Sequence, residues 1–269
     1  MRGWTGVLLA ALLPLAVAAS PARAEDRAPG PGPGWKAPPR VLLERAASAA
    51  EDGRWEEAER NLREVISRGI DDPEAWYDLG TVLAHEGKTG EAVLALRRAL
   101  FLDPRHRDAR ANLEWVRARL ADASEGLDGG RDLLARWLAL LPERGALVAA
   151  IGLEWAGALL LLGGILVPRL RGRPGPRRAG LAALLLAVLL AVPPLGLAWL
   201  RATDRGAVVL ADRVEARSGP GKNNPVLFTV HEGLEVELGR ARDTWVYVRV
   251  PGGPAGWVPR SAVAPVRPD

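Results

Sequence analysis

The stretch Arg169-Leu-Arg-Gly-Arg-Pro-Gly-Pro-Arg-Arg178 lies between two apolar runs and determines how the chain is organised. It contains five arginines and no acidic residue, and the runs 146–167 and 179–200 each have the ~20 residues needed to cross a bilayer core. Short loops rich in Lys and Arg stay on the cytoplasmic side. The sequence therefore predicts two transmembrane helices joined by a cytoplasmic basic loop, 168–178, in a bacterial inner membrane. The rest of the chain is expected on the extracytoplasmic, periplasmic side.

The N-terminus has the layout of a secretory signal. Arg2 precedes a run without charged residues, Trp4 to Ala19, and small residues follow, ending in Ala22-Arg-Ala24. We expect a signal peptide over 1–24 and an extended Pro/Gly-rich linker over 25–39. An uncleaved anchor is the alternative, and it gives the same orientation.

Composition argues against several classes of function. The net charge of +4 and the pI near 10.0 are typical of nucleic-acid-binding proteins. The five loop arginines exceed this charge and leave the remainder near neutral, so we expect no nucleic-acid partner. The chain has no cysteine, which excludes disulfides and thiol chemistry. The histidines, His85, His106 and His231, lie far apart, and no motif places a catalytic set. We expect neither an enzyme nor a metal or cofactor site.

An internal repeat precedes the membrane part. Pro73-Glu-Ala-Trp-Tyr-Asp-Leu-Gly80, followed by Leu83, Gly87, Ala92, Leu96, Ala99 and Pro104, is similar to the tetratricopeptide repeat (TPR), with its period of about 34 residues. A weaker copy lies one period earlier, and a single helix follows to about Leu120. We expect two repeats and a capping helix over 40–121. Such arrays usually need about three repeats to bury a continuous core, so this one should lean on a partner or on another copy.

Short alternating strands with turn residues between them fill the C-terminal part, 207–266. This part resembles the bacterial SH3 (SH3b) domain, because the pattern residues of that domain occur in the same order and spacing: Glu215-Ala-Arg-Ser-Gly-Pro-Gly221, Gly233, Trp245 with Val248, and Gly256-Trp-Val258. The resemblance implies a small β-barrel. Trp245 and Trp257 are then either core residues or part of a ligand platform.

Features near the membrane leave alternatives open. Apolar residues from Leu133 to Leu141 recur at helical spacing, so we expect an amphipathic helix over 131–141. It lies on the outer membrane surface or packs back on the TPR helices. Glu154 in the first span is either an intramembrane contact to a neighbouring helix or a side chain that reaches the outer surface. Pro193-Pro194 should kink the second span without ending it.

The order of these parts predicts the fold class. We expect a multidomain membrane protein with all-α TPR helical repeats, a two-helix transmembrane hairpin and an all-β SH3-like barrel. This order resembles BatE-type proteins of the aerotolerance (Bat) operons. The resemblance implies a membrane-anchored accessory protein that assembles with operon partners bearing von Willebrand factor A domains.

The predicted function is that of an envelope scaffold that holds a partner protein or peptide. First helices line the inner surface of TPR arrays, so the predicted groove residues are Leu43, Ala47, Tyr77, Thr81 and His85. Some TPR groups clamp a peptide carboxylate with Lys and Asn. Because the corresponding residues here include Glu44, Asp78 and Asn112, a basic or apolar ligand is favoured.

The alternative function is a cell-wall-binding module that grips peptidoglycan through the SH3b domain. The two membrane spans separate the TPR and SH3b segments in the sequence. We therefore expect the two domains to fold independently, without a shared core.

Overall fold

The computed structural model describes residues 37–122, 130–167 and 174–267. The predicted signal peptide, almost all of the Pro/Gly-rich linker and Arg169, Arg171 and Arg173 of the basic loop lie outside these residues. Pro38–Asp269 belongs to one compact unit. The expected fold class is confirmed, since helical repeats, two long apolar helices and an antiparallel β domain are all present.

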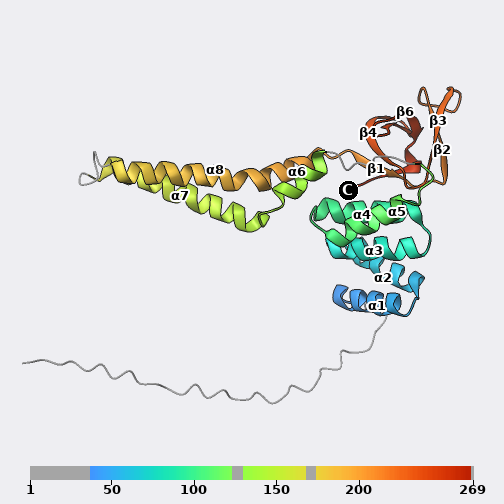
Figure 1. Cartoon of the computed structure of the whole chain (residues 1–269), viewed down its shortest axis with the longest axis horizontal. Helices are drawn as coiled ribbons and strands as arrows, with labels where there is room; N and C mark the ends of the chain where they lie inside the picture. Colours follow the sequence, from blue (N-terminus) through green and yellow to red (C-terminus); the bar gives the residue numbers. More distant parts are fainter. Residues whose placement is uncertain (1–36, 123–129, 168–173, 268–269) are drawn as a thin grey trace, which may run out of the picture. The chain divides into compact units, whose positions relative to one another are not determined.

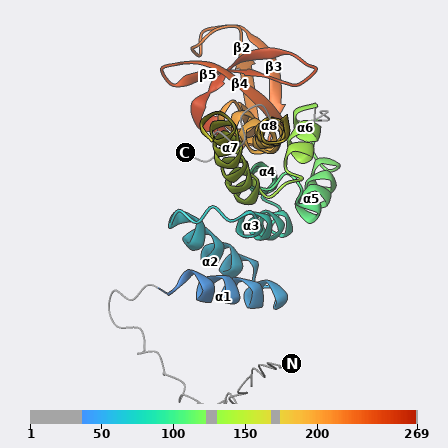
Figure 2. The same cartoon turned by 90° about the vertical axis from the view of Figure 1, so that its left-hand side faces the viewer.

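The repeat array consists of α1 (Pro39–Glu51), α2 (Trp55–Ser67), α3 (Pro73–His85), α4 (Thr89–Leu102) and α5 (Arg107–Arg117). Successive helices pack against each other in chain order (Figure 1, Figure 2). The same local devices recur one repeat apart. Pro39 and Pro73 each begin a helix, where a missing N–H leaves no hydrogen bond unmade. Gly53 and Gly87 have φ angles of 74° and 78° and turn the chain between the helices of each repeat.

The close pairing of α3 and α4 depends on Gly80. A Cβ atom there would lie 2.7 Å from Leu96 Cγ and 3.1 Å from the Leu96 backbone nitrogen, so a larger residue would push the helices apart. Trp76 and Leu83 of α3 are buried in the same cluster as Ala92 of α4. These contacts match the roles that the repeat pattern predicts for these residues.

The C-terminal β domain contains β1 (Gly206–Val209), β2 (Arg213–Arg217), β3 (Val226–His231), β4 (Glu235–Arg242), β5 (Trp245–Arg249), β6 (Ala255–Pro259), the 3-10 helix η2 (Arg260–Ala262) and β7 (Val263–Pro265). The strands form one antiparallel sheet in the order β3-β2-β6-β5-β4-β1-β7. Val209, Val236, Val248 and Val258 are fully buried in its core. Gly233, a residue of the predicted pattern, has a φ of 84° and turns the chain from β3 into β4.

The two long helices are α7 (Glu143–Leu166) and α8 (Pro174–Ala202). Both are long and apolar enough to cross a membrane, over Gly145–Gly163 and Pro174–Ala202. They meet closely at Gly157 and Gly180. A Cβ atom on Gly157 would lie 2.9 Å from the Gly180 carbonyl oxygen, and one on Gly180 would lie 3.0 Å from the Gly157 carbonyl oxygen. Small residues therefore set the separation of the pair.

α8 begins earlier than the predicted span. Pro174 and Pro176 belong to its first turn, where proline fits, so Arg177 and Arg178 lie on the helix rather than in the loop. The helix continues through Pro193-Pro194, as predicted.

The short helix α6 (Gly130–Leu138) packs on α8. Leu138 is buried against Leu197 and Leu200 of α8, with Ala135 and Ala139 beside it. The rest of the apolar stripe, including Leu133 and Trp137, is exposed. The stripe therefore does not pack on the repeat helices, which was one of the two predicted alternatives.

Candidate protein-binding groove

Tyr77 and Thr81 lie on successive turns of α3 and are brought together with Asn112 of α5 and with His106, the N-cap residue of that helix. The Tyr77 ring lies 4.8 Å from the His106 ring, centroid to centroid. Thr81 Oγ1 accepts a hydrogen bond of 3.0 Å from the Asn112 side-chain amide. All four side chains are partly or largely buried, so they join the first helices of the array and form a polar surface between them.

The remaining predicted groove residues have different surroundings. Leu43 on α1 packs partly against the repeat core, and Ala47 one turn later is exposed. His85 stacks on Trp55, the first residue of α2, with ring centroids 4.2 Å apart and planes 1° from parallel. His85 therefore contributes to the contact between the repeats, and Tyr77 and Thr81 are the better candidates for ligand contact.

Asp78, the residue after Tyr77, is the carboxylate of this surface whose pKa is shifted. Partial desolvation raises its pKa, the nearby carboxylates Glu74 and Asp72 also raise it and His106 lowers it, so that the resulting pKa is about 6. The negative charge of ionised Asp78 is thus compensated only in part, by His106. A cationic group bound here would relieve the repulsion, which agrees with the predicted preference for a basic ligand.

The β domain packs against α4 and also contacts α5. Val208 of β1 and Val266 after β7 are buried in the same cluster as Leu96 and Leu100 of α4. Arg98 of α4 donates to the carbonyl oxygens of Pro265 and Val266, at 3.1 and 3.3 Å. The β domain therefore occupies the place that a further repeat would have in a longer array.

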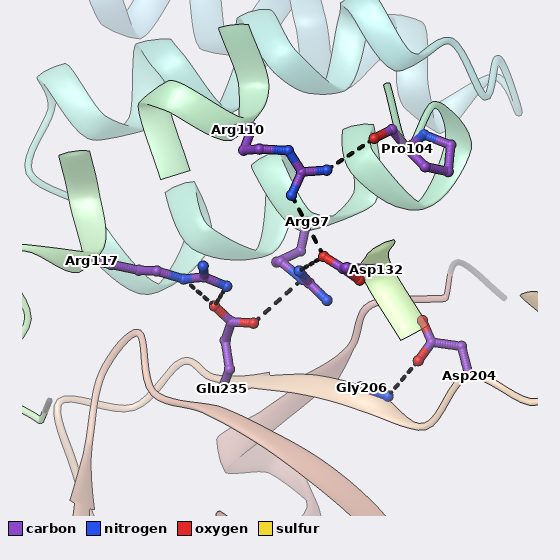
Figure 3. A network of polar contacts seen from close by, with 8 residues as sticks. All are labelled: Arg97, Pro104, Arg110, Arg117, Asp132, Asp204, Gly206 and Glu235. Carbon is purple, nitrogen blue, oxygen red and sulfur yellow. Dashed lines mark hydrogen bonds and ion pairs between the residues drawn. The ribbon is translucent and has the colours of Figure 1, made fainter. Parts of the chain in front are cut away.

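A buried carboxylate lies at the centre of this contact (Figure 3). Glu235, the first residue of β4, is 1% exposed and lies 3.3 Å from Nε of Arg97 on α4. It also accepts hydrogen bonds from Arg117 of α5, with Nε at 2.6 Å. Arg97 continues the network to Asp132 of α6 at 3.2 Å. One acid thus joins two repeat helices to the β domain.

Two further contacts surround this network. The Glu232 carboxylate accepts a hydrogen bond of 2.5 Å from the Gly90 N–H in the first turn of α4, where the helix dipole favours a negative charge. His231 lies against Asp122 after α5, with Nδ1 3.0 Å from Oδ1 and its backbone N–H 2.7 Å from Oδ2. The loop between β3 and β4 therefore contributes much of the contact.

The array is also tied to the end of α8. Arg201 donates to the carbonyl oxygens of Phe101 and Leu102 in the last turn of α4, at 3.1 and 2.6 Å. These carbonyls have no partner within a helix, so a guanidinium group there satisfies them and complements the helix dipole. The base of the apolar hairpin and the repeat array are thereby linked.

Two segments of the chain match known families. Residues 43–107 match the tetratricopeptide repeat model, and residues 211–265 match the bacterial SH3 domain model. The chain joins a TPR array to an SH3b domain. No curated protein and no solved structure matches it. The first match covers most of α1 and all of α2, α3 and α4, and the second covers β2 to β7.

The expectation that the TPR array and the SH3b domain share no core is wrong. They share buried side chains and a charge network, although α7 and α8 separate them in the sequence. The physical reason lies in α4, which has buried apolar residues on several of its faces, among them Val93, Leu94 and Leu96. Each apolar face of such a helix must be buried by another element that packs against it.

The SH3b tryptophans differ in burial. Trp257 is 5% exposed and makes an edge contact with Tyr247, with ring centroids 5.6 Å apart, while Trp245 is half-buried. Arg240 lies over both rings of the Tyr247–Trp257 pair, at 5.8 and 5.4 Å from their centroids. Trp257 therefore belongs mainly to the packing of the domain, and Tyr247 with Arg240 is its accessible part.

Glu154 is exposed at the middle of the Gly145–Gly163 stretch of α7. Ala146, Ala150 and Gly157 are the buried positions of that helix. Within the part of the chain that the structure describes, Glu154 makes no hydrogen bond or ion pair. The predicted intramembrane contact therefore does not involve α8 and stays a prediction for a helix of another chain.

Proposed function

We propose that this protein is a membrane-anchored scaffold of the bacterial envelope, which holds a partner protein in the extracytoplasmic groove of its TPR array. The proposal rests on one observation: in the described part of the chain, the SH3b domain packs on one side of the array and not on the other. The SH3b domain covers α4, whereas the side with Tyr77, Asp78 and Thr81 has no such cover among the described residues. The SH3b domain thus completes the array and leaves its groove for a partner.

The chemistry of the groove favours a basic or apolar partner segment. Asp78 and Glu74 are exposed and lie close enough for mutual repulsion, and Tyr77 offers an aromatic face beside them. A Lys or Arg side chain would pair with the carboxylates and pack its stem on the ring. A BatE-like role, with von Willebrand factor A-domain proteins of a Bat operon as partners, is consistent with this surface.

Membrane anchoring is supported by the surface of α7 and α8. Large apolar side chains such as Ile151, Trp155, Leu185 and Leu189 are more than half exposed. Helices of this length in the core of a soluble protein would be buried, and an apolar surface of this kind in water would drive association. The hydrocarbon core of a bilayer would bury these apolar side chains, which no described residue buries.

The groove is tested by charge reversal in the full-length protein. Asp78→Lys places a cation where a basic segment would bind, and Glu56→Lys makes the same change at an exposed site on α2. Proteins that co-purify in mild detergent are quantified by mass spectrometry. We expect Asp78→Lys to lose the partners that wild type and Glu56→Lys retain. Equal recovery from all three would overturn the groove assignment.

Peptidoglycan binding through the SH3b domain is the second candidate, because Tyr247 and Arg240 form an accessible aromatic and cationic pair. It predicts that the full-length protein sediments with purified peptidoglycan and that Tyr247→Ala abolishes this. Sedimentation that depends on Tyr247, together with retained partners in Asp78→Lys, would replace the scaffold proposal with this one.

A further inference from the structure

A cavity of about 800 Å³ lies between α5 and α6, beside the base of the apolar hairpin. Its lining combines cationic and apolar side chains. The charged residues are Arg105, Arg107, Arg110 and Arg136 with Asp103 and Glu114, and the large apolar residues are Leu133, Trp137 and Leu140. The lining thus contains four guanidinium groups and two carboxylates, and Leu133, Trp137 and Leu140 form its apolar wall.

The apolar wall has no protein cover among the described residues. Leu133, Trp137 and Leu140 are 63%, 62% and 54% exposed, while the other side of α6 is buried on α8. α6 ends at Leu138 and α7 begins at Glu143, so the link between them reaches at most ~18 Å. If α7 crosses a membrane, the wall lies within reach of the headgroup region, which extends several Å beyond the hydrocarbon core.

The lining carries more positive than negative charge, with four arginines and two acidic residues. Arg110 ends the network of Figure 3, where its Nη1 lies 3.8 Å from Asp132 and its Nη2 donates to the Pro104 carbonyl oxygen at 2.9 Å. Burial lowers the pKa of Arg110, and the positive charges of Arg136 and Arg97 lower it further, although Asp132 opposes this. Arg107 and Arg136 make no side-chain hydrogen bond or ion pair with any described residue.

We propose that this cavity binds an anionic phospholipid of the membrane that holds α7 and α8. Arg110, Arg107 and Arg136 contact the phosphate, because guanidinium groups donate paired hydrogen bonds to its oxygens. The acyl chains lie along Leu133, Trp137 and Leu140 and enter the bilayer beside α7. A zwitterionic lipid would bring an additional cation to a site that is already positive. The proposal rests on the membrane insertion in the proposed function and is independent of the groove.

Lipid retention in the full-length protein tests this site. The protein is reconstituted in vesicles of phosphatidylcholine and phosphatidylglycerol, extracted in mild detergent, and its bound lipids are identified by native mass spectrometry. We expect phosphatidylglycerol to be retained about tenfold more than phosphatidylcholine, and an excess of inorganic phosphate to leave it bound because the acyl chains hold it. Equal retention of the two lipids, or displacement by inorganic phosphate, would overturn the lipid assignment.

The variant pair is chosen so that folding is not at risk. Arg107→Gln with Arg136→Gln removes two exposed guanidinium groups that have no described partner, and Arg45→Gln with Arg60→Gln does the same on α1 and α2. The first pair should lose the preference for phosphatidylglycerol and the second should keep it. Co-flotation of each protein with the vesicles reports membrane insertion separately. A protein that floats without lipid preference refutes only this site, whereas one that does not float refutes the membrane anchoring as well.

Discussion

Glu235→Gln tests whether the buried charge network joins the TPR array to the SH3b domain. The carboxylate is 1% exposed and lies between the guanidinium groups of Arg97 and Arg117, whose side chains are 7% and 16% exposed. Glutamine keeps the shape but removes the negative charge, so two buried cations lose their shared partner. Removal of one member of a buried ion pair costs about 3–5 kcal/mol. A domain is stable by only about 5–15 kcal/mol, so the effect should be large.

The free energy of unfolding is measured in detergent micelles by urea titration with tryptophan fluorescence. Glu237→Gln, on the same strand but exposed, is the matched control and should change stability by no more than about 0.5 kcal/mol. We expect Glu235→Gln to lower the free energy of unfolding by the amount given and to separate the unfolding of the array from that of the SH3b domain. A loss as small as that of the control would refute the reasoning.

Two further predictions concern the array itself. Gly80→Ala should destabilise it by about 1–3 kcal/mol, because the added Cβ would lie 2.7 Å from Leu96 Cγ, and an unchanged urea midpoint would contradict the tight contact. The pKa of Asp78 is raised from 3.8 to about 6, so between these pH values the folded protein holds a proton that the unfolded chain has lost. Stability should therefore fall as pH rises through this window, and Asp78→Asn should flatten the dependence in thermal melts, whereas parallel curves would refute the assignment.

The parts of the fold were predictable because each has its own local pattern. Gly53 and Gly87 stand one repeat apart at turns that require a positive φ, and Gly80 stands where two helices touch. The strands of the SH3b domain follow from alternation and from glycines such as Gly233. Such patterns involve residues that are close together in the sequence, so they can be recognised from one sequence without a structure.

The contact between the two domains was not predictable in the same way. Glu235 follows Leu234 at the start of a strand and resembles a solvent-facing acid, and nothing nearby indicates that arginines far away in the sequence surround it. The sequence of α4 did indicate that another element packs on this helix. Val93, Leu94 and Leu96 leave it little polar surface apart from the adjacent Arg97 and Arg98. A helix with apolar residues on several faces predicts that another element packs on it, although the pattern does not say which element.

The candidate groove was predicted in part. The position of Tyr77 and Thr81 follows from the repeat pattern, since first helices line the inner surface. His85 follows the same pattern, but its ring stacks on Trp55, an aromatic residue that the sequence places in the other repeat. The raised pKa of Asp78 depends on partial desolvation and on the spacing of Glu74 and Asp72, which only the structure supplies.

Site-specific labelling most directly tests the claim that the α7–α8 hairpin carries the TPR array and the SH3b domain outside the cytoplasm. The chain has no cysteine, so single cysteines can be introduced at exposed arginines without a background. Arg60→Cys on α2, Arg242→Cys on β4 and Arg177→Cys at the start of α8 are treated with a membrane-impermeant maleimide in spheroplasts. We predict that Arg60→Cys and Arg242→Cys are labelled and that Arg177→Cys is labelled only after lysis. Labelling of Arg177→Cys in intact spheroplasts, with protection of the other two, would contradict the account.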